Sequence, residues 1–161
     1  MKVMTGEIVE AYHAIKAHAQ ERQGVRWAYG MTRNLKRMEP IVQSVAEAEK
    51  ATPEFLEYEK ARVELAKEHA DKDEKGRPIT NGQSFQIADQ EAFSEALMAL
   101  QEEHKPALEA RQKQVEEVQG LLGEDVEYEP FLVSIDDAVG DVSGNLMEAI
   151  FFLIKDDGDQ R

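Results

Sequence analysis

Two short motifs in this 161-residue chain have the spacing of metal sites, but each lacks ligands that such a site needs. Glu10 and His13 lie three residues apart, which puts both side chains on one face of a helix, as in carboxylate-bridged di-metal bundles. Such a site needs a second Glu-x-x-His motif, and neither His69 nor His104 has a glutamate three residues before it. We therefore predict no metal site and interpret His13 as a residue of a helix surface.

The polar segment that starts at Asp71 has the beginning of a calcium-binding EF-hand loop, with Asp73 and Gly76 at the third and sixth positions. Its fifth position is Lys75, which offers no oxygen ligand, and its twelfth is Gly82, where a bidentate glutamate belongs. We interpret this segment as a solvated polar turn.

Residue types that commonly carry catalysis occur here without the patterns that catalysis needs. The chain has no cysteine, no phosphate-binding loop, no Gly-x-Ser-x-Gly and no His-Glu-x-x-His motif. Adjacent acids such as Glu102 and Glu103 are frequent, but acid–base catalysis needs a desolvated carboxyl group, which neighbours on an amphipathic helix do not provide. We predict that the protein is not an enzyme and uses no cofactor.

Charge is distributed unevenly along the chain. Residues 89–161 hold nineteen acidic and five basic residues, whereas residues 1–51 hold six acidic and eight basic ones. The net charge of −14 predicts no direct binding to nucleic acid, because phosphates repel such a surface. The chain lacks an apolar run long enough for a membrane span and an N-terminal apolar leader, so we expect no membrane contact and a cytoplasmic location.

The acidic second half is the first candidate binding site. Its carboxylates would mimic the phosphates of a nucleic acid and so occupy a nucleic-acid-binding enzyme; the alternative is that they only keep the chain soluble. The candidate acidic residues are Glu116, Glu117, Glu124, Asp125, Glu127, Glu129, Asp136, Asp137 and Asp141.

A basic cluster in the near-neutral first half is the second candidate, with Trp27 and Tyr29 between its members. It is a docking surface for an acidic partner, an internal clamp for the acidic half, or simply the charged exterior of a helix. Its residues are Arg26, Arg33, Lys36 and Arg37.

Helical periodicity predicts three helices in residues 1–70, over residues 7–20, 25–51 and 53–70. We expect Thr5 to cap the first, and Thr52 with Pro53 to start the third. Pro40 should face solvent and kink the second helix without breaking it, with Trp27 at the edge of the apolar side. The residues expected to face inward are Ile8, Tyr12, Ile15 and Ala19, then Met31, Leu35, Met38, Val42 and Val45, then Phe55, Leu56, Val63 and Ala66.

A turn and a β-hairpin are predicted for residues 71–89, with the hairpin near 77–88. Asn81-Gly82 is the dipeptide that best adopts two positive φ angles between hairpin strands. A loose alternation near residues 126–134 favours a third strand that joins this hairpin.

The rest of residues 90–161 is predicted as acidic helices, the short strand and an apolar C-terminal helix. Asp89 should cap the next helix, and Pro106 divides the following apolar stripes into a kinked helix or two helices. Residues 145–154 are nearly all apolar, so this helix should be buried in the core or against a partner, including a second copy in a homodimer. Phe151 and Phe152 are the candidate apolar contacts, and an acidic tail follows. The predicted fold class is mainly α: a single-domain antiparallel helical bundle over residues 1–161 with a small β-hairpin.

Four stretches of this chain resemble a family of small helical proteins of tailed bacteriophages and prophages. They are Trp27–Glu39, Tyr58–Arg62, Lys72–Pro78 and Ile87–Asp89, and the likeness covers roughly residues 7–105. Gly30 and Thr32 stand where the family has longer aliphatic or basic residues. The resemblance implies phage origin and brings no catalytic or cofactor residues with it.

For a small acidic helical phage protein we expect a function in protein–protein binding. The leading hypothesis is an inhibitor that blocks a nucleic-acid-binding host protein, such as a defence nuclease. The alternative is a head or tail assembly factor that contacts other phage proteins, and a small hydrolase is a third hypothesis that the missing motifs disfavour.

Overall fold

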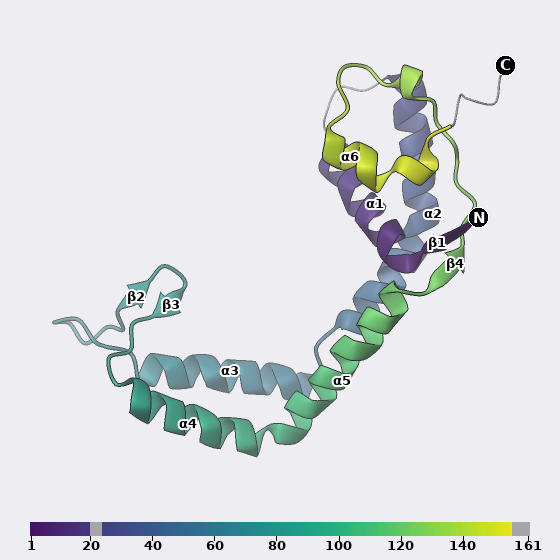
Figure 1. The fold of residues 1–161 in the computed structure, drawn as a ribbon. Helices are drawn as coiled ribbons and strands as arrows, with labels where there is room; N and C mark the ends of the chain where they lie inside the picture. Colours follow the sequence, from purple (N-terminus) through teal and green to yellow (C-terminus); the bar gives the residue numbers. More distant parts are fainter. Residues whose placement is uncertain (20–23, 156–161) are drawn as a thin grey trace. The chain divides into compact units, whose positions relative to one another are not determined.

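The computed structural model describes residues 1–19 and 24–155. These are mainly α-helical, as predicted, and contain two small antiparallel sheets (Figure 1). The chain forms two compact units, one built from Met1–Glu49 and the chain from Glu117 onward, the other from Lys50–Glu116. The third predicted helix therefore belongs to the second unit. A single domain over residues 1–161 stays a prediction.

The first unit is built around two helices, α1 (Thr5–Ala17) and α2 (Val25–Glu49), which pack on each other. Strand β1 (Lys2–Met4) pairs with β4 (Asp125–Glu127), which follows the end of α5 (Lys105–Leu122). The C-terminal part adds a 3₁₀ turn η1 (Ile135–Asp137), the short helix α6 (Gly144–Ala149) on α1, and a second turn η2 (Phe151–Leu153). The predicted single helix over residues 145–154 is thus a short α-helix followed by a 3₁₀ turn.

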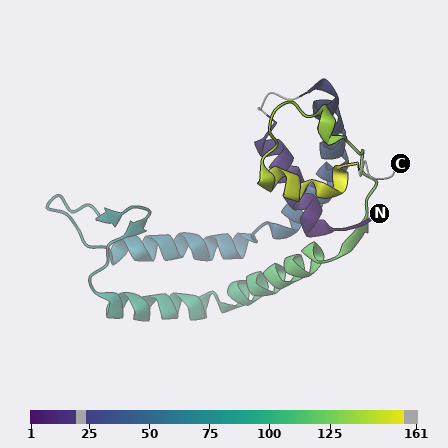
Figure 2. The ribbon, with the colours of Figure 1, turned by 45° about the horizontal axis from the view of Figure 1, so that its top comes forward.

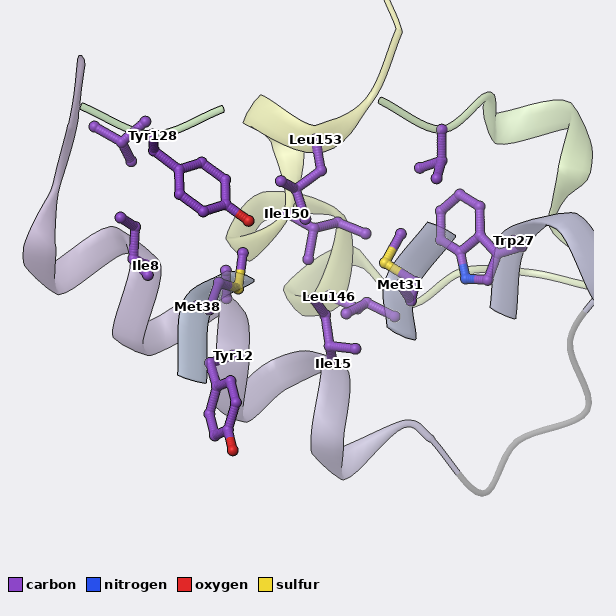
Figure 3. Packing of buried hydrophobic residues seen from close by; sticks show 13 residues of the cluster. Ile8, Tyr12, Ile15, Trp27, Met31, Met38, Tyr128, Leu146, Ile150 and Leu153 are labelled. Atoms are coloured by element: carbon purple, nitrogen blue, oxygen red, sulfur yellow. The ribbon is translucent and has the colours of Figure 1, made fainter. Parts of the chain in front are cut away.

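The core of the first unit lies between α1, α2, α6 and η2, as Figure 3 shows. Ile8, Tyr12 and Ile15 of α1 are buried members of this core, as predicted, and so are Ile150 and Leu153 from the C-terminal part (Figure 3). The seam of α2 is also as predicted, with Met31, Met38 and Val45 buried and Leu35 and Val42 partly buried. Two predictions are wrong: Ala19 is exposed, and Trp27 is fully buried instead of lying at the edge.

The start of α1 differs from the prediction, because Thr5 is inside the helix and does not cap it. Met4 is the N-cap, and its N–H donates to the carboxylate of Glu7 at 3.0 Å. The Thr5 hydroxyl instead donates to the Glu124 carbonyl at 3.1 Å, which ties α1 to the chain before β4. The helix ends at Ala17, and the predicted end at residue 20 lies outside the described residues, as does the acidic tail.

The strand predicted near residues 126–134 exists as β4, but its partner was predicted wrongly. β4 pairs with β1 at the N-terminus, with Val3 opposite Val126 and Lys2 opposite Glu127, and does not join the hairpin. β1 has only three residues, so its alternation is too short to be recognised in the sequence. In α2, Pro40 is exposed and the helix continues through it, as predicted.

The second unit is a helical hairpin in which α4 (Gln90–Glu103) runs back along α3 (Pro53–Glu68) (Figure 2). The predicted starts of both helices are confirmed: Thr52 accepts from the Phe55 N–H, and Asp89 from the Ala92 N–H. Tyr58 is the buried residue of α3, with its ring 6.0 Å from that of Phe55 and 5.7 Å from that of His104. Leu56 and Val63, which were predicted to face inward, are exposed.

Of the two alternatives predicted at Pro106, a kinked helix or two helices, the structure has two helices, α4 and α5. α4 ends with His104 as its C-cap, and α5 begins at Lys105. The N–H groups in the first turn of a helix have no partner within the helix, so proline, which lacks an N–H, is tolerated there. Pro106 therefore suits its position in the first turn of α5. Across the described residues, every helix is too short or too polar to cross a membrane.

A small β-hairpin connects α3 and α4, as predicted. Strands β2 (Thr80–Asn81) and β3 (Ser84–Phe85) flank a two-residue turn. Within this hairpin turn only Gly82 has a positive φ, of 67°, so the turn has the φ pattern of type II′ and not the two positive angles that were predicted for Asn81-Gly82. The EF-hand-like segment is a turn around Asp73, which accepts hydrogen bonds from the backbone and the guanidinium of Arg77.

Candidate functional site

Helix α2 is covered on one side by residues 128–138, which we call the return segment. Asn34, fully buried in α2, donates from Nδ2 to the Phe131 carbonyl at 2.8 Å and accepts from the Phe131 N–H at 2.9 Å. The Tyr128 hydroxyl donates to Asn34 Oδ1 at 3.2 Å. These three hydrogen bonds hold an irregular stretch of chain against the helix. Asn34 was not among the predicted site residues.

A glycine lets the return segment come close to α2. A Cβ added to Gly30 would lie 2.1 Å from Cγ1 of Val133, a separation that no real structure tolerates. This close approach explains why a glycine stands at this position of α2. A glycine inside a helical pattern is the sequence signal for such an approach.

The tyrosine of the return segment is inside the core. Tyr128 is 4% exposed, and its ring lies 5.9 Å from that of Phe152 in an edge-on arrangement. Burial raises the pKa of the Tyr128 hydroxyl to about 12, because the phenolate would lose its hydration; the Arg37 charge opposes this shift. The return segment is thus anchored by a neutral tyrosine and a buried amide.

Two members of the predicted basic cluster make polar contacts with the return segment. The Arg37 guanidinium donates to the Glu129 carbonyl, and Arg26 lies 3.9 Å from the Asp137 carboxylate. These contacts are of the kind expected of an internal clamp. The Arg26 side chain is 87% exposed, so its ion pair contributes little to stability.

Arg33 has a different environment, because two aromatic rings hold its guanidinium. Its Cζ lies 5.8 Å from the ring centre of Tyr29 and 5.2 Å from that of Phe131, and its Nη1 donates to the Tyr29 hydroxyl at 3.0 Å. The two rings meet edge-on at 5.7 Å. Arg33 borders a surface depression of about 340 Å³ together with Tyr29, Thr32, Lys36 and Arg37.

A second depression of about 240 Å³ adjoins Tyr29 on the same helix. Its lining residues are Arg26, Tyr29, Phe131, Leu132, Val133, Asp137 and Lys155. The predicted basic cluster therefore borders two hollows that share an exposed tyrosine. Lys155 and Phe131 also line the second hollow. They were not among the predicted site residues, because they come from distant parts of the chain.

The predicted acidic residues lie on several elements. Glu116 and Glu117 are on α5, where Glu116 accepts from the Gln112 amide and belongs to the second unit. In the first unit, Glu124, Asp125 and Glu127 lie at β4, and Glu127 is 3.9 Å from the N-terminal ammonium group. Glu129, Asp136 and Asp137 lie in the return segment, and Asp141 in the loop after it.

The predicted apolar contacts differ from each other. Phe151 is 75% exposed, whereas Phe152 packs on Tyr128. Both border a depression of about 280 Å³ with Ala149 and three glutamates, Glu7 and Glu10 of α1 and Glu148 of α6. These glutamates were not among the predicted binding residues, because only the packing of α6 on α1 brings them to Phe151.

The part of the chain that the structure describes contains no group of three His, Asp or Glu side chains placed to hold a metal ion. Glu10 of the Glu-x-x-His motif borders the Phe151 depression, and His13 is exposed on α1. The binding chemistry visible on the first unit is therefore that of two surfaces, one acidic around Phe151 and one basic and aromatic around Arg33.

Comparisons with known proteins add no relative. No family model, no curated protein and no solved structure matches this chain.

Proposed function

We propose that this protein acts by binding a basic surface of another protein through the acidic surface around Phe151. The observation that carries this proposal is the 75% exposed aromatic ring beside Glu7, Glu10 and Glu148. A large exposed aromatic side chain at a hollow is typical of a residue that anchors a protein interface. The surrounding carboxylates select a partner of opposite charge and speed its association.

The partner we propose is a nucleic-acid-binding protein of the host, which the phage-type protein inhibits. Proteins that hold nucleic acid present lysine and arginine to its phosphates, and an acidic protein can occupy the same groove. The net charge of −14 and the resemblance to phage proteins support this proposal. The alternative is an assembly factor whose helix at residues 145–154 packs on another phage protein. It draws less support, since Leu146, Ile150 and Leu153 are buried in the core of the first unit.

The test is retention of host proteins on the immobilised protein, with double-stranded DNA as competitor. We expect a retained nucleic-acid-binding protein that the DNA displaces and that salt elutes, and we expect its activity on nucleic acid to fall when our protein is bound. Phe151→Ala and Glu148→Lys should each weaken that binding about tenfold or more.

Two substitutions in the second unit serve as matched controls. Met98→Ala removes an apolar side chain that is 66% exposed, and Glu103→Lys makes the same charge change at an exposed position. Neither should alter binding. The proposal would be contradicted if salt, competitor DNA and Phe151→Ala all left the retention of the partner unchanged.

A further inference from the structure

We propose that the basic, aromatic surface around Arg33 is a second binding site, which takes an acidic peptide segment of a partner protein. It is separate from the Phe151 surface, so the inference goes beyond the proposed function and does not depend on it. Its central residues are Tyr29, Arg33, Lys36 and Phe131.

The first argument is the state of the Arg33 guanidinium. Two rings and one tyrosine hydroxyl hold it, yet among the described residues no carboxylate forms an ion pair with it. The planar fork of an arginine matches a carboxylate through two parallel hydrogen bonds. An arginine held in place beforehand loses less side-chain entropy on binding, so the site is prepared for a carboxylate.

The second argument is the rigidity of the support. Phe131 is held by both of its backbone hydrogen bonds to the buried Asn34, and Phe131 in turn lies against Tyr29 and Arg33. The binding surface therefore rests on a fully buried amide and not on a loose loop. Such support keeps the guanidinium in one geometry.

The third argument concerns the charges on either side of Tyr29. Lys36 lies in one hollow and Lys155 in the other, and neither forms an ion pair with a described residue. Tyr29 is 55% exposed between them and Leu132 is 45% exposed nearby. The surface thus offers cations around an apolar centre, which fits a segment with carboxylates on both sides of an apolar residue.

An acidic peptide fits this surface better than a nucleic acid does. The whole chain carries −14, and a nucleic acid strand that extends past the site would bring its phosphates close to acids at the border of the site, such as Asp137. A short peptide carries fewer charges, and at physiological salt charges more than about 8 Å away are largely screened. Local contacts then decide the binding.

The experiment measures fluorescence anisotropy of a labelled peptide of repeated Glu-Glu-Leu units at physiological salt. The full-length protein should bind it saturably, and should not bind the corresponding Gln-Gln-Leu peptide. Arg33→Gln should weaken binding about tenfold, since a charge-assisted pair of hydrogen bonds is lost. Arg62→Gln removes the same charge from the second unit and should leave binding unchanged.

Four results would overturn the proposal, and three of them come from the anisotropy measurement. They are absence of binding to the Glu-Glu-Leu peptide, equal binding by Arg33→Gln and Arg62→Gln, and tighter binding of a labelled oligothymidine that Arg33→Gln abolishes. The last would assign the surface to single-stranded nucleic acid. The fourth result is self-association in sedimentation velocity that Arg33→Gln removes, which would assign the surface to a second copy of this chain.

Discussion

Asn34 pairs with both backbone polar groups of Phe131, as a neighbouring β-strand would. The two residues are 97 positions apart, and Asn34 is fully buried in α2. An irregular segment packed on a helix has no strand or helix to satisfy its N–H and C=O groups, so a side chain must do it. The amide of Asn34 carries its donor and its acceptor on separate atoms, so it can pair with a carbonyl and an N–H at the same time.

Asn34→Ala should therefore destabilise the protein strongly. It leaves the partly buried N–H and carbonyl of Phe131 without these partners, which costs about 3 kcal/mol of unfolding free energy. Urea denaturation measures this. Gln43→Ala, at an exposed position of the same helix, should change the free energy by less than about 0.5 kcal/mol. Equal effects of the two substitutions would mean that the pairing does not hold the return segment.

Gly30→Ala should also destabilise, although alanine is the better helix former by about 1 kcal/mol. The new methyl group would lie 2.1 Å from Val133, and the overpacking should cost about 2 kcal/mol net. Thermal unfolding measures the change. Gly120→Ala in α5 is the matched control, because nothing lies within 4 Å of its added Cβ; it should stabilise the protein. In the double variant, Val133→Ala should relieve part of the destabilisation that Gly30→Ala causes, since the smaller side chain makes room for the new methyl group.

Stability should fall between about pH 10 and 12 because of Tyr128. Its pKa is raised from 10 to about 12 in the folded protein, so in this range the unfolded chain releases a proton that the folded chain keeps. The stabilisation is complete below pH 10 and decreases by about 1 kcal/mol per pH unit above it. Urea denaturation across this range measures the slope. Tyr128→Phe should flatten it, whereas Tyr29→Phe, at an exposed tyrosine, should not.

Asp73 should control the order of its turn without controlling global stability. Its carboxylate accepts from the N–H groups of Lys75 and Arg77 and from the Arg77 guanidinium, and these hydrogen bonds, those of Arg77 first, lower its pKa. The turn should lose order as the pH falls through this lowered pKa, because the protonated carboxyl accepts weakly. NMR titration checks the direction of the shift.

Asp73→Ala should speed amide hydrogen exchange at Lys75 and Arg77 and leave the melting temperature unchanged, because the turn is exposed. Glu74→Ala is the neighbouring control, with an exposed side chain. Unchanged exchange in the Asp73 variant would show that the backbone alone maintains the turn.

The features that the sequence determined are those that depend on neighbours along the chain. Thr52 with Pro53 and Asp89 start helices because capping needs only the next three residues. The seam from Met31 to Val45 follows from helical periodicity, and a glycine turn defines the hairpin. Even here the local sequence allows more than one conformation, because the hairpin turn has one positive φ, at Gly82, and not the two that were predicted.

The tertiary structure decided which residues meet and which remain exposed. β4 pairs with β1 across more than a hundred residues, and the exposure of Leu56 and Val63 depends on what packs against α3. Helical periodicity identifies the faces of a helix but not the elements that pack on them. Neither the pairing of β4 with β1 nor the exposure of Leu56 and Val63 could therefore be predicted.

The same holds for the candidate site. The sequence determined that arginines and aromatics are interleaved near residue 30, and that acids dominate the second half. Only the packing of the return segment on α2 brings Phe131 to Arg33, and only the packing of α6 on α1 brings Glu148 to Glu7 and Glu10. Charge and residue type are written along the chain, whereas a binding surface is made by the segments that folding brings together.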